Sequence, residues 1–328
     1  MKLPIVHNTA DWTPLMTDSA AWEEALHHIT ERAGLEFGEI EPGFPGTCAV
    51  FQVKPVEKNS YYIKIFPPVS RADFSKEASV LEFLSGKPLI PKLLAQGTLR
   101  GDCDFPYLVT QAVPGHALRD SRPLIPEAEG IRVASRLGLA VRDLHGLDLK
   151  SFRAFPKDES SWTRFIRKRR EECLPELAKE NLLSPSLMDE IHSFLGRAEP
   201  SPSRLPPRLL HGDITEDHVY LEEARGVWKL SGLIDFGDVE AGDPFYEWSP
   251  LWFGTFDGKA PLFRAFLRAY EPRIPLNRLF RERAMAFSLF HRFGPSSILS
   301  QIRAASLSTQ GWGLEDFLEW LWPEALES

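Results

Sequence analysis

Two aspartates, Asp213 and Asp235, occur in contexts that could support phosphoryl transfer. Each follows a short apolar, strand-like run, and β-forming residues at 219–221 and 227–230 predict a hairpin that brings both carboxylates to one end of a site. One carboxylate could orient a hydroxyl nucleophile and accept its proton, while the other could hold a metal ion on phosphates. Either aspartate alone would equally fit a turn or a helix cap, so the interpretation depends on the pair.

A lysine upstream could contact the phosphates of a nucleotide. Lys64 lies in the strand-like run YYIKIF, whose alternate positions are apolar, and a charge there needs a task or must extend toward water. A carboxylate on the next predicted helix could hold this lysine, and that helix offers Glu77 and Glu82. From the residues alone, either glutamate could instead be a solvated surface charge.

The segment from Gly43 to Thr47, which lies between strand candidates, is the candidate phosphate loop. Gly43, Gly46 and Thr47 could present backbone amides to phosphate oxygens. The segment lacks a full GxGxxG pattern, and Pro45 removes one donor. An ordinary Gly-Pro turn is therefore an equal alternative.

The pattern of predicted elements changes along the chain. β-Forming runs and two helices dominate the first part, whereas the second part is mainly helical. We therefore expect an α+β protein with a small antiparallel-sheet lobe at 1–113 and a larger helical lobe at 114–328. The expected elements are a helix that begins at Asp18 or Ser19 and ends at Gly34, strands at 49–54, 61–66, 92–98 and 106–113, and helices at 73–84, 127–145, 160–179 and 185–195.

Two later segments have distinct compositions. The proline-rich stretch 199–208 cannot continue a helix and should deliver the chain in extended form. The stretch 314–326 predicts an amphipathic helix with large apolar side chains, for which packing on the second lobe is favoured over a membrane or partner surface.

Composition restricts the class of protein. The chain has 328 residues, of which 43% are hydrophobic, and this is enough for a sizeable core. A formal net charge of −8 argues against a nucleic-acid binder, and it suits a cationic small substrate or simply solubility. Three scattered cysteines, Cys48, Cys103 and Cys173, predict neither a zinc site nor disulfides. No run resembles a signal peptide or a membrane span, so we expect a soluble cytoplasmic protein.

The region with both aspartates resembles the aminoglycoside phosphotransferase and choline kinase superfamily. The resemblance is carried by His211-Gly212-Asp213 and by Ile234-Asp235-Phe236-Gly237-Asp238, and the order of further motifs agrees from about Phe37 to Trp252. It implies a bilobal protein-kinase-like fold that binds ATP with Mg²⁺ between its lobes, with GTP as an open alternative.

The resemblance also implies roles for individual residues. It assigns Asp213 as the catalytic base, Asp235 as the magnesium ligand and His211 as a scaffold residue. It favours Glu77 over Glu82 as the partner of Lys64.

One position departs from the family pattern. A metal-binding Asn is usual five residues after the catalytic Asp, but this chain has His218, as macrolide phosphotransferases tend to have. Because imidazole suits softer ions than Mg²⁺, we expect His218 to bind metal weakly or through water, with a loop histidine bonded to backbone as an equal alternative. Glu216 or Asp217 could supply an oxygen instead, although neither needs a function.

Other positions match the family more loosely. Gln111, Ala112 and Val113 resemble the hinge that contacts the purine. The match makes His145 structural and Asp243 a helix cap rather than a ligand.

An acceptor pocket is harder to place. Glu247, Trp248, Trp252 and Asp257 could line a pocket for a cationic or amphipathic substrate, although tryptophans at helical spacing are more often core.

We therefore expect an enzyme that moves the γ-phosphate of ATP to a hydroxyl of a small molecule. Antibiotics, sugars, amino alcohols and amino acids are not distinguished by the sequence. A nucleotide-binding, pseudokinase-like regulator without turnover is the alternative, because His218 replaces Asn and the phosphate loop is poor. A protein kinase is disfavoured, since HGD replaces HRD and no APE segment follows. We expect no nucleic-acid or membrane partner, and the oligomeric state is not indicated.

Overall fold

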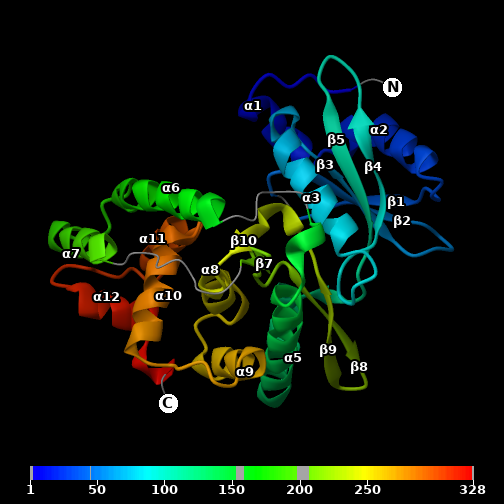
Figure 1. Ribbon diagram of the computed structural model, residues 1–328. Coiled ribbons are helices and arrows are strands. Elements are labelled where there is room, and N and C mark those ends of the chain that lie inside the picture. Colours follow the sequence, from blue (N-terminus) through cyan, green and yellow to red (C-terminus); the bar gives the residue numbers. More distant parts are fainter. Residues whose placement is uncertain (1–2, 45, 153–158, 198–206, 327–328) are drawn as a thin grey trace.

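A computed structural model describes residues 3–44, 46–152, 159–197 and 207–326, and its ribbon divides into two lobes (Figure 1). The first lobe contains a five-stranded antiparallel sheet in the order β1-β2-β3-β5-β4. Its strands are β1 (Glu39–Pro42), β2 (Ala49–Lys54), β3 (Tyr61–Ile65), β4 (Leu93–Leu99) and β5 (Phe105–Gln111).

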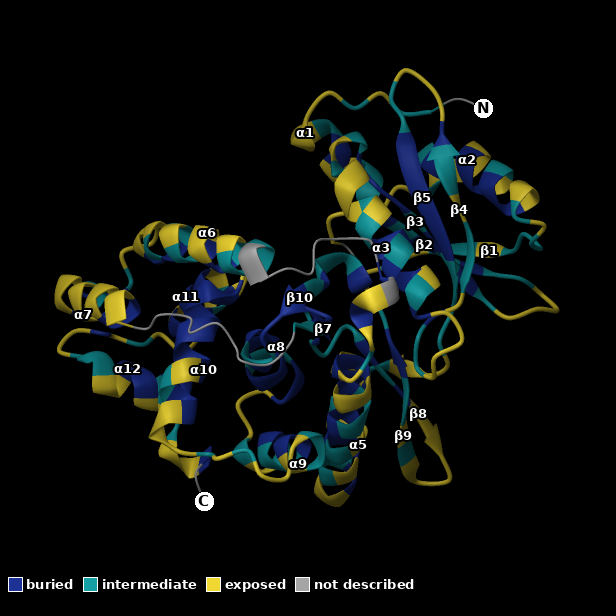
Figure 2. Ribbon diagram, viewed as in Figure 1, coloured by how far each residue is buried: buried dark blue, intermediate teal, exposed yellow. Residues whose placement is uncertain are grey.

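One face of this sheet packs against helix α2 (Ser19–Arg32). Burial alternates along β2, so that Phe51 enters the same apolar cluster as Leu26 of the helix. Strand β5, which is buried over most of its length, is dark blue in Figure 2. The Asp18 carboxylate caps the helix, and Gly34, with φ +64°, follows its end. The predicted helix limits are therefore confirmed.

Helix α3 (Arg71–Phe83) connects the sheet to the helical lobe. Its buried Ala78 and Leu81 belong to the same apolar cluster as Leu108 of β5 and the interior of the second lobe. The core is thus continuous across the junction, and α3 is fixed relative to both lobes.

The second lobe is mainly helical. Its small ladders pair β6 with β8, β8 with β9, and β7 with β10. The elements are β6 (His116–Ala117), α4 (Leu118–Ser121), α5 (Glu127–His145), α6 (Glu159–Ala178), α7 (Pro185–Arg197), β7 (Arg208–Leu210), β8 (Val219–Ala224), β9 (Val227–Leu233), β10 (Glu240–Gly242), α8 (Phe245–Pro250), α9 (Ala260–Tyr270), α10 (Arg278–Phe290), α11 (Gly294–Ala304) and α12 (Leu314–Leu321).

The predicted α+β arrangement with an antiparallel sheet followed by helices is confirmed. Strand β1 was not predicted, because its sequence EIEP contains two acids and a proline that rarely signal a strand. The exact division at 113/114 stays a prediction. Most of the proline-rich stretch 199–208 lies outside the described residues, and Arg208 begins β7.

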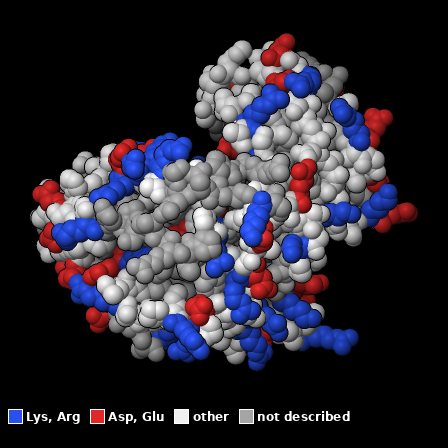
Figure 3. All heavy atoms as spheres, viewed as in Figure 1, with Lys and Arg blue, Asp and Glu red and all other residues white. Residues whose placement is uncertain are grey.

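The C-terminal amphipathic helix is confirmed as α12. Phe317 and Leu321 are fully buried on the second lobe, as is the following Trp322. Among the described residues, no helix is both long and apolar enough to cross a membrane. Cys48, Cys103 and Cys173 are free thiols, as expected. On the face shown in Figure 3, basic and acidic side chains of the described residues are interspersed.

Helices α5 and α9 touch at Gly138. A Cβ atom added to this glycine would lie 2.3 Å from the carbonyl oxygen of Phe266, so only glycine allows the two helix backbones to approach this closely. This contact orients α5, whose C-terminal turn carries the buried His145.

We predict that Gly138→Ala lowers the free energy of unfolding by roughly 1–3 kcal/mol, because the backbones must separate to admit the methyl group. Urea denaturation with an unchanged slope would measure this loss. Gly196→Ala in α7 is the matched control, since no atom lies within 4 Å of its added Cβ. Equal stability of Gly138→Ala and the wild type would contradict the prediction.

Candidate active site

A buried lysine joins the two lobes. The Lys64 ammonium on β3 donates to the Glu77 carboxylate of α3 and to the Asp235 carboxylate after β9, each at 2.8 Å. Glu82, the other candidate partner, instead accepts a hydrogen bond from Gln96. The structure thus brings Lys64, Glu77 and Asp235 together and leaves Glu82 outside the cluster.

The charged groups of this cluster shift one another's pKa values. Burial opposes the charge of Lys64, but Asp235 and Glu77 outweigh it and raise the pKa of the lysine above its usual value. Burial raises the pKa of Glu77 to about 7 despite the nearby ammonium. Burial also opposes ionisation of Asp235, but Lys64 and His218 lower the pKa of this aspartate. Asp235 is therefore the ionised carboxylate of the cluster, which suits a metal ligand.

The backbone at Asp235 is in an uncommon conformation. Its φ of +61° lies in the left-handed region, where a residue other than glycine is strained. The Asp235 Oδ1 atom accepts the Gly237 amide at 3.3 Å, and a Cβ at Gly237 would lie 3.2 Å from the same oxygen. The strain is maintained by contacts that aim the carboxylate at Lys64.

The HGD segment is held by the ring of its own histidine. His211 Nε2 donates to the Ile234 carbonyl at 2.9 Å, and Nδ1 accepts the Asp213 amide at 3.3 Å. Burial lowers the pKa of His211 to about 4, so the ring is neutral with its proton on Nε2. These bonds tie the start of segment 211–218 (the catalytic segment, which contains the expected base Asp213) to the end of β9. They support the scaffold role expected for His211.

The carboxylate of Glu247 holds the backbone of the same segment. Its fully buried carboxylate accepts the amides of His211 at 3.0 Å and Gly212 at 2.9 Å, and His145 lies 3.4 Å away. Burial alone would raise the pKa of Glu247, but the His145 hydrogen bond and the Gly212 amide together lower it. The sequence pattern gave no signal for this role beyond an acid in an aromatic helix start.

Asp213 lies between the Lys64–Glu77–Asp235 cluster and a cavity. Burial raises the pKa of Asp213 to about 6, with the carboxylates of Asp235 and Glu247 acting in the same direction and His218 opposing them. This residue lines a cavity of about 440 Å³ in the second lobe. A carboxylate whose pKa lies near neutrality can accept a proton from a hydroxyl group.

The geometry of His218 is compatible with both interpretations that the sequence allowed. Its Nδ1 atom donates to the Asp213 backbone carbonyl at 2.7 Å, as a loop histidine bonded to backbone would. The other ring nitrogen, Nε2, lies 3.9 Å from Asp235 Oδ2. The ring can therefore be bonded to backbone and still present a metal-binding nitrogen beside Asp235.

Glu216 and Asp217 have other partners. Asp217 binds Arg119 at 2.5 Å, and Glu216 binds Arg122 at 2.7 Å. These ion pairs join the catalytic segment to α4 and the turn after it, so neither acid is placed as an alternative metal ligand.

The candidate phosphate loop connects β1 to β2. The Gly43 amide bonds to the Val50 carbonyl at 2.7 Å, and the Thr47 carbonyl accepts the indole of Trp12 at 2.9 Å. A Cβ atom added to Gly46 would have no neighbouring atom within 4 Å. Phe44, although 65% exposed, lies against the guanidinium of Arg119, 4.6 Å from its ring centroid. The loop thus touches the same arginine that binds the catalytic segment.

The hinge candidates lie at the end of β5. The Gln111 amide donates to the Lys92 carbonyl at 2.8 Å, and the Ala112 amide donates to the Ser60 carbonyl at 3.0 Å, so both amides already have acceptors. Successive residues of an extended chain direct their peptide groups to opposite sides, so those of Val113 are expected on the same side as those of Gln111.

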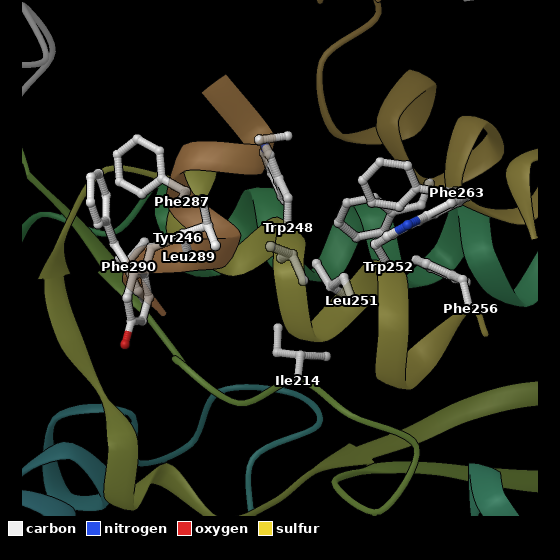
Figure 4. Close-up of a cluster of buried hydrophobic side chains, with 14 of the residues drawn as sticks. Ile214, Tyr246, Trp248, Leu251, Trp252, Phe256, Phe263, Phe287, Leu289 and Phe290 are labelled. Atoms are coloured by element: carbon white, nitrogen blue, oxygen red, sulfur yellow. The ribbon is translucent and has the colours of Figure 1, made fainter. Parts of the chain in front are cut away.

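The cavity at Asp213 departs from the predicted pocket. Glu247 and Trp248 are fully buried and do not line this cavity, so Trp248 is a core residue, as tryptophans at helical spacing more often are, and Glu247 holds amides of the HGD segment instead. Figure 4 shows Trp248 within an aromatic cluster, with Ile214 pointing toward Leu251. Trp252 and Asp257 do line the cavity, with Phe253, Phe293, Ser297, Gln301 and Trp320 among the other lining residues.

Asp235 and His218 suit a divalent cation that is also bound by the phosphates of a nucleotide. No group of three or more His, Cys, Asp or Glu side chains in the described part of the chain forms a preformed metal site. Mg²⁺ is usually bound by one or two carboxylates with phosphates and water, and Asp235 with a neighbouring His218 nitrogen meets that lower requirement.

A Lys-Glu pair in the first lobe, the carboxylate of HGD and a second carboxylate after β9 define a kinase-like phosphotransferase. The chain belongs to the phosphotransferase enzyme family, whose model matches residues 47–286. The class is that of small-molecule kinases.

Three known proteins illustrate the relationship. Viomycin phosphotransferase of Streptomyces vinaceus is 31% identical over 51% of this chain and 58% of its own length. A probable ketoamine kinase of Enterococcus faecium is 24% identical over 77% of this chain and 87% of its own. The solved GDP and kanamycin complex of APH(2")-IIia has a TM-score of 0.64 at 23% identity, covering 91% of this chain and 97% of that one. The predicted kinase-like fold is confirmed.

We predict that Glu247→Gln lowers kcat about 100-fold while the nucleotide KM changes less than about three-fold, because one amide of the HGD segment loses its acceptor and Asp213 shifts. Steady-state kinetics would measure both constants. Glu23→Gln, an exposed charge on α2, is the matched control. A kcat within three-fold of the wild type would contradict the anchoring role.

We predict that Phe44→Ala and Arg119→Ala each raise the nucleotide KM about two- to five-fold, which is the size of an exposed cation-π contact. Because both variants remove the same contact, the double variant should be no worse than the more affected single variant. Val56→Ala, on an exposed side chain of the same lobe, serves as control. If the two increases in nucleotide KM multiply in the double variant, the two residues act independently and the prediction is contradicted.

Proposed function

We propose that this protein transfers the γ-phosphate of ATP to a hydroxyl group of a small molecule, with GTP as a second possible donor. The observation that carries the proposal is the position of Asp213. This carboxylate lies between the Lys64–Glu77–Asp235 cluster, where the phosphates would bind, and the 440 Å³ cavity, where an acceptor would bind.

Each residue of the cluster has a role in this proposal. Lys64, held by Glu77, binds phosphate oxygens, and the Gln111 carbonyl and the peptide groups of Val113 bind the purine. Gly43, Gly46 and Thr47 lie over the phosphates. Bound Mg²⁺, held by Asp235 with His218, would neutralise phosphate charge.

Asp213 then orients the acceptor. Its carboxylate accepts a hydrogen bond from the acceptor hydroxyl and receives that proton as the oxygen attacks the γ-phosphate. The raised pKa of Asp213, caused mainly by burial, makes it a stronger base than an exposed aspartate.

The cavity indicates the chemistry of the acceptor. Asp213 and Asp257 are its charged lining residues, and its walls include aromatic rings together with Ser297 and Gln301. Viomycin phosphotransferase and the kanamycin complex are named for antibiotics. We propose a hydroxylated acceptor with an apolar face and few positive charges, since Asp257 also lies within 4 Å of both Arg122 and Lys259.

The main test is a screen of hydroxylated antibiotics, sugars, amino alcohols and amino acids for nucleotide consumption with ATP and GTP. With the best acceptor, Asp213→Ala should lower kcat at least about 1,000-fold, because base and orientation are lost together. Asp189→Ala on the surface of α7 is the control. Full transfer activity of Asp213→Ala would end the assignment.

The same screen separates the enzyme from a regulator that binds nucleotide without turnover. Equal nucleotide affinity with and without divalent metal, together with no transfer to any acceptor, would favour the regulator. His218→Asn should keep activity and lower the Mg²⁺ concentration for half-maximal rate, since amide oxygen is the harder ligand, whereas His218→Ala should raise it.

A further inference from the structure

A second cavity, of about 460 Å³, lies between α5 and α9 and is separate from Asp213. It lies within the size range of small-molecule sites. Most of its lining side chains are apolar, among them Ile125, Ile131, Leu137, Phe256 and Leu262. Ile125, Ile131 and Leu262 are partly accessible.

The geometry of two helices creates this space. At Gly138, helices α5 and α9 are in backbone contact, as described above. Toward the start of α5, Gly130 and Ala134 face α9 one turn apart, and both line the cavity. A Cβ on Gly130 would reach only ordinary proximity to Leu262, at 3.4 Å. The helices therefore diverge from Gly138, and small residues leave the gap unfilled.

The charges around the cavity favour an anion. Arg122 and Lys259 line it, and Glu127 is the one acidic side chain among its lining residues, all of which lie in the described part of the chain. Arg122 pairs closely with Glu216, at 2.7 Å, whereas Lys259 Nζ lies 3.9 Å from the Asp257 carboxylate, so Lys259 is the cation with the looser ion pair.

The cavity shares its wall with the catalytic segment. Thr255 lines it and donates its hydroxyl to the carbonyl of Ile214, the residue after Asp213, at 2.8 Å. Arg122 donates to the carbonyls of Gly254 and Thr255 at 2.8 and 2.9 Å, and Gly254 lines the cavity at Asp213. A molecule that moves this wall would move the acceptor site.

We propose that the second cavity is a binding site for a small apolar molecule with a single acidic group, and that its occupancy changes acceptor affinity. The apolar body replaces water against the diverging helices, and the acidic group pairs with Lys259. The coupling half of this proposal rests on the proposed function, whereas the binding half does not.

Binding can be tested by calorimetry with decanoate as the probe and decan-1-ol as its uncharged analogue. Decanoate should bind more tightly than decan-1-ol, and Lys259→Gln should reduce this preference about three-fold, as expected for a partly exposed ion pair. Ala134→Phe should fill the space and weaken decanoate binding at least ten-fold. Ala128→Phe, exposed on the same helix, is the matched control.

A second variant keeps the test decisive if Ala134→Phe does not fold. Gly130→Leu fills the mouth of the cavity from a partly exposed position, and it should also weaken decanoate binding at least ten-fold. No decanoate binding below 1 mM (about −4 kcal/mol), unchanged binding in Gly130→Leu, or displacement of decanoate by nucleotide would overturn the site.

Coupling is measured separately, once an acceptor is known. Decanoate should change the acceptor dissociation constant by the same factor as the acceptor changes that of decanoate, because linkage is reciprocal. Decanoate binding with no effect on the acceptor would overturn the coupling and leave the site intact. An inactive protein that still binds decanoate would count against the proposed function alone.

Discussion

The position of the catalytic segment depends on the buried carboxylate of Glu247. A charge without solvent is costly unless its lone pairs are occupied, and here two consecutive amides and a histidine ring occupy them. Gly212, with φ +83°, lets the chain turn over this carboxylate, since a Cβ would lie 2.3 Å from the Asp238 carbonyl. Ile214 continues the anchorage by packing into the aromatic cluster of Figure 4. Asp213 is therefore fixed by its neighbours on both sides, in addition to its own backbone bonds with His211 and His218.

The lobes meet through ions as well as through apolar contacts. Lys64 links a strand of the sheet to Glu77 of α3 and to Asp235 of the second lobe. Under the proposed function, phosphate oxygens compete with Asp235 for this ammonium. The carboxylate then becomes available to a cation that arrives with the nucleotide. The strained backbone of Asp235 destabilises the folded state by about 1–3 kcal/mol. Such a cost is consistent with a residue that is present for the direction of its carboxylate and not for the stability of the fold.

Local signals predicted the parts of the structure whose causes are local. Alternation in β2 and β3 and the capping of α2 follow from neighbouring residues, and so do the positions of Asp213 and Asp235 at strand ends. Glu247 could not be assigned from the sequence, because its partners are amides that lie 35 and 36 residues earlier. It was a candidate pocket residue, yet tertiary packing placed its carboxylate against the amides of the HGD segment. The divergence of α5 and α9 likewise depends on a backbone approach at Gly138 that no periodicity encodes.

The short segment from α4 to the turn before α5 connects sites that the chain otherwise separates. Arg119 contacts Phe44 of the phosphate loop and Asp217 of the catalytic segment. Arg122, three residues later, binds Glu216 and the carbonyls that form the wall between the two cavities. Both guanidiniums are planar, with several donors, so each can satisfy partners on different elements at once, which a lysine cannot do in the same way. Under the proposed function, a shift of this segment would therefore reach the nucleotide, Asp213 and the acceptor together, and the second cavity lies directly beside it.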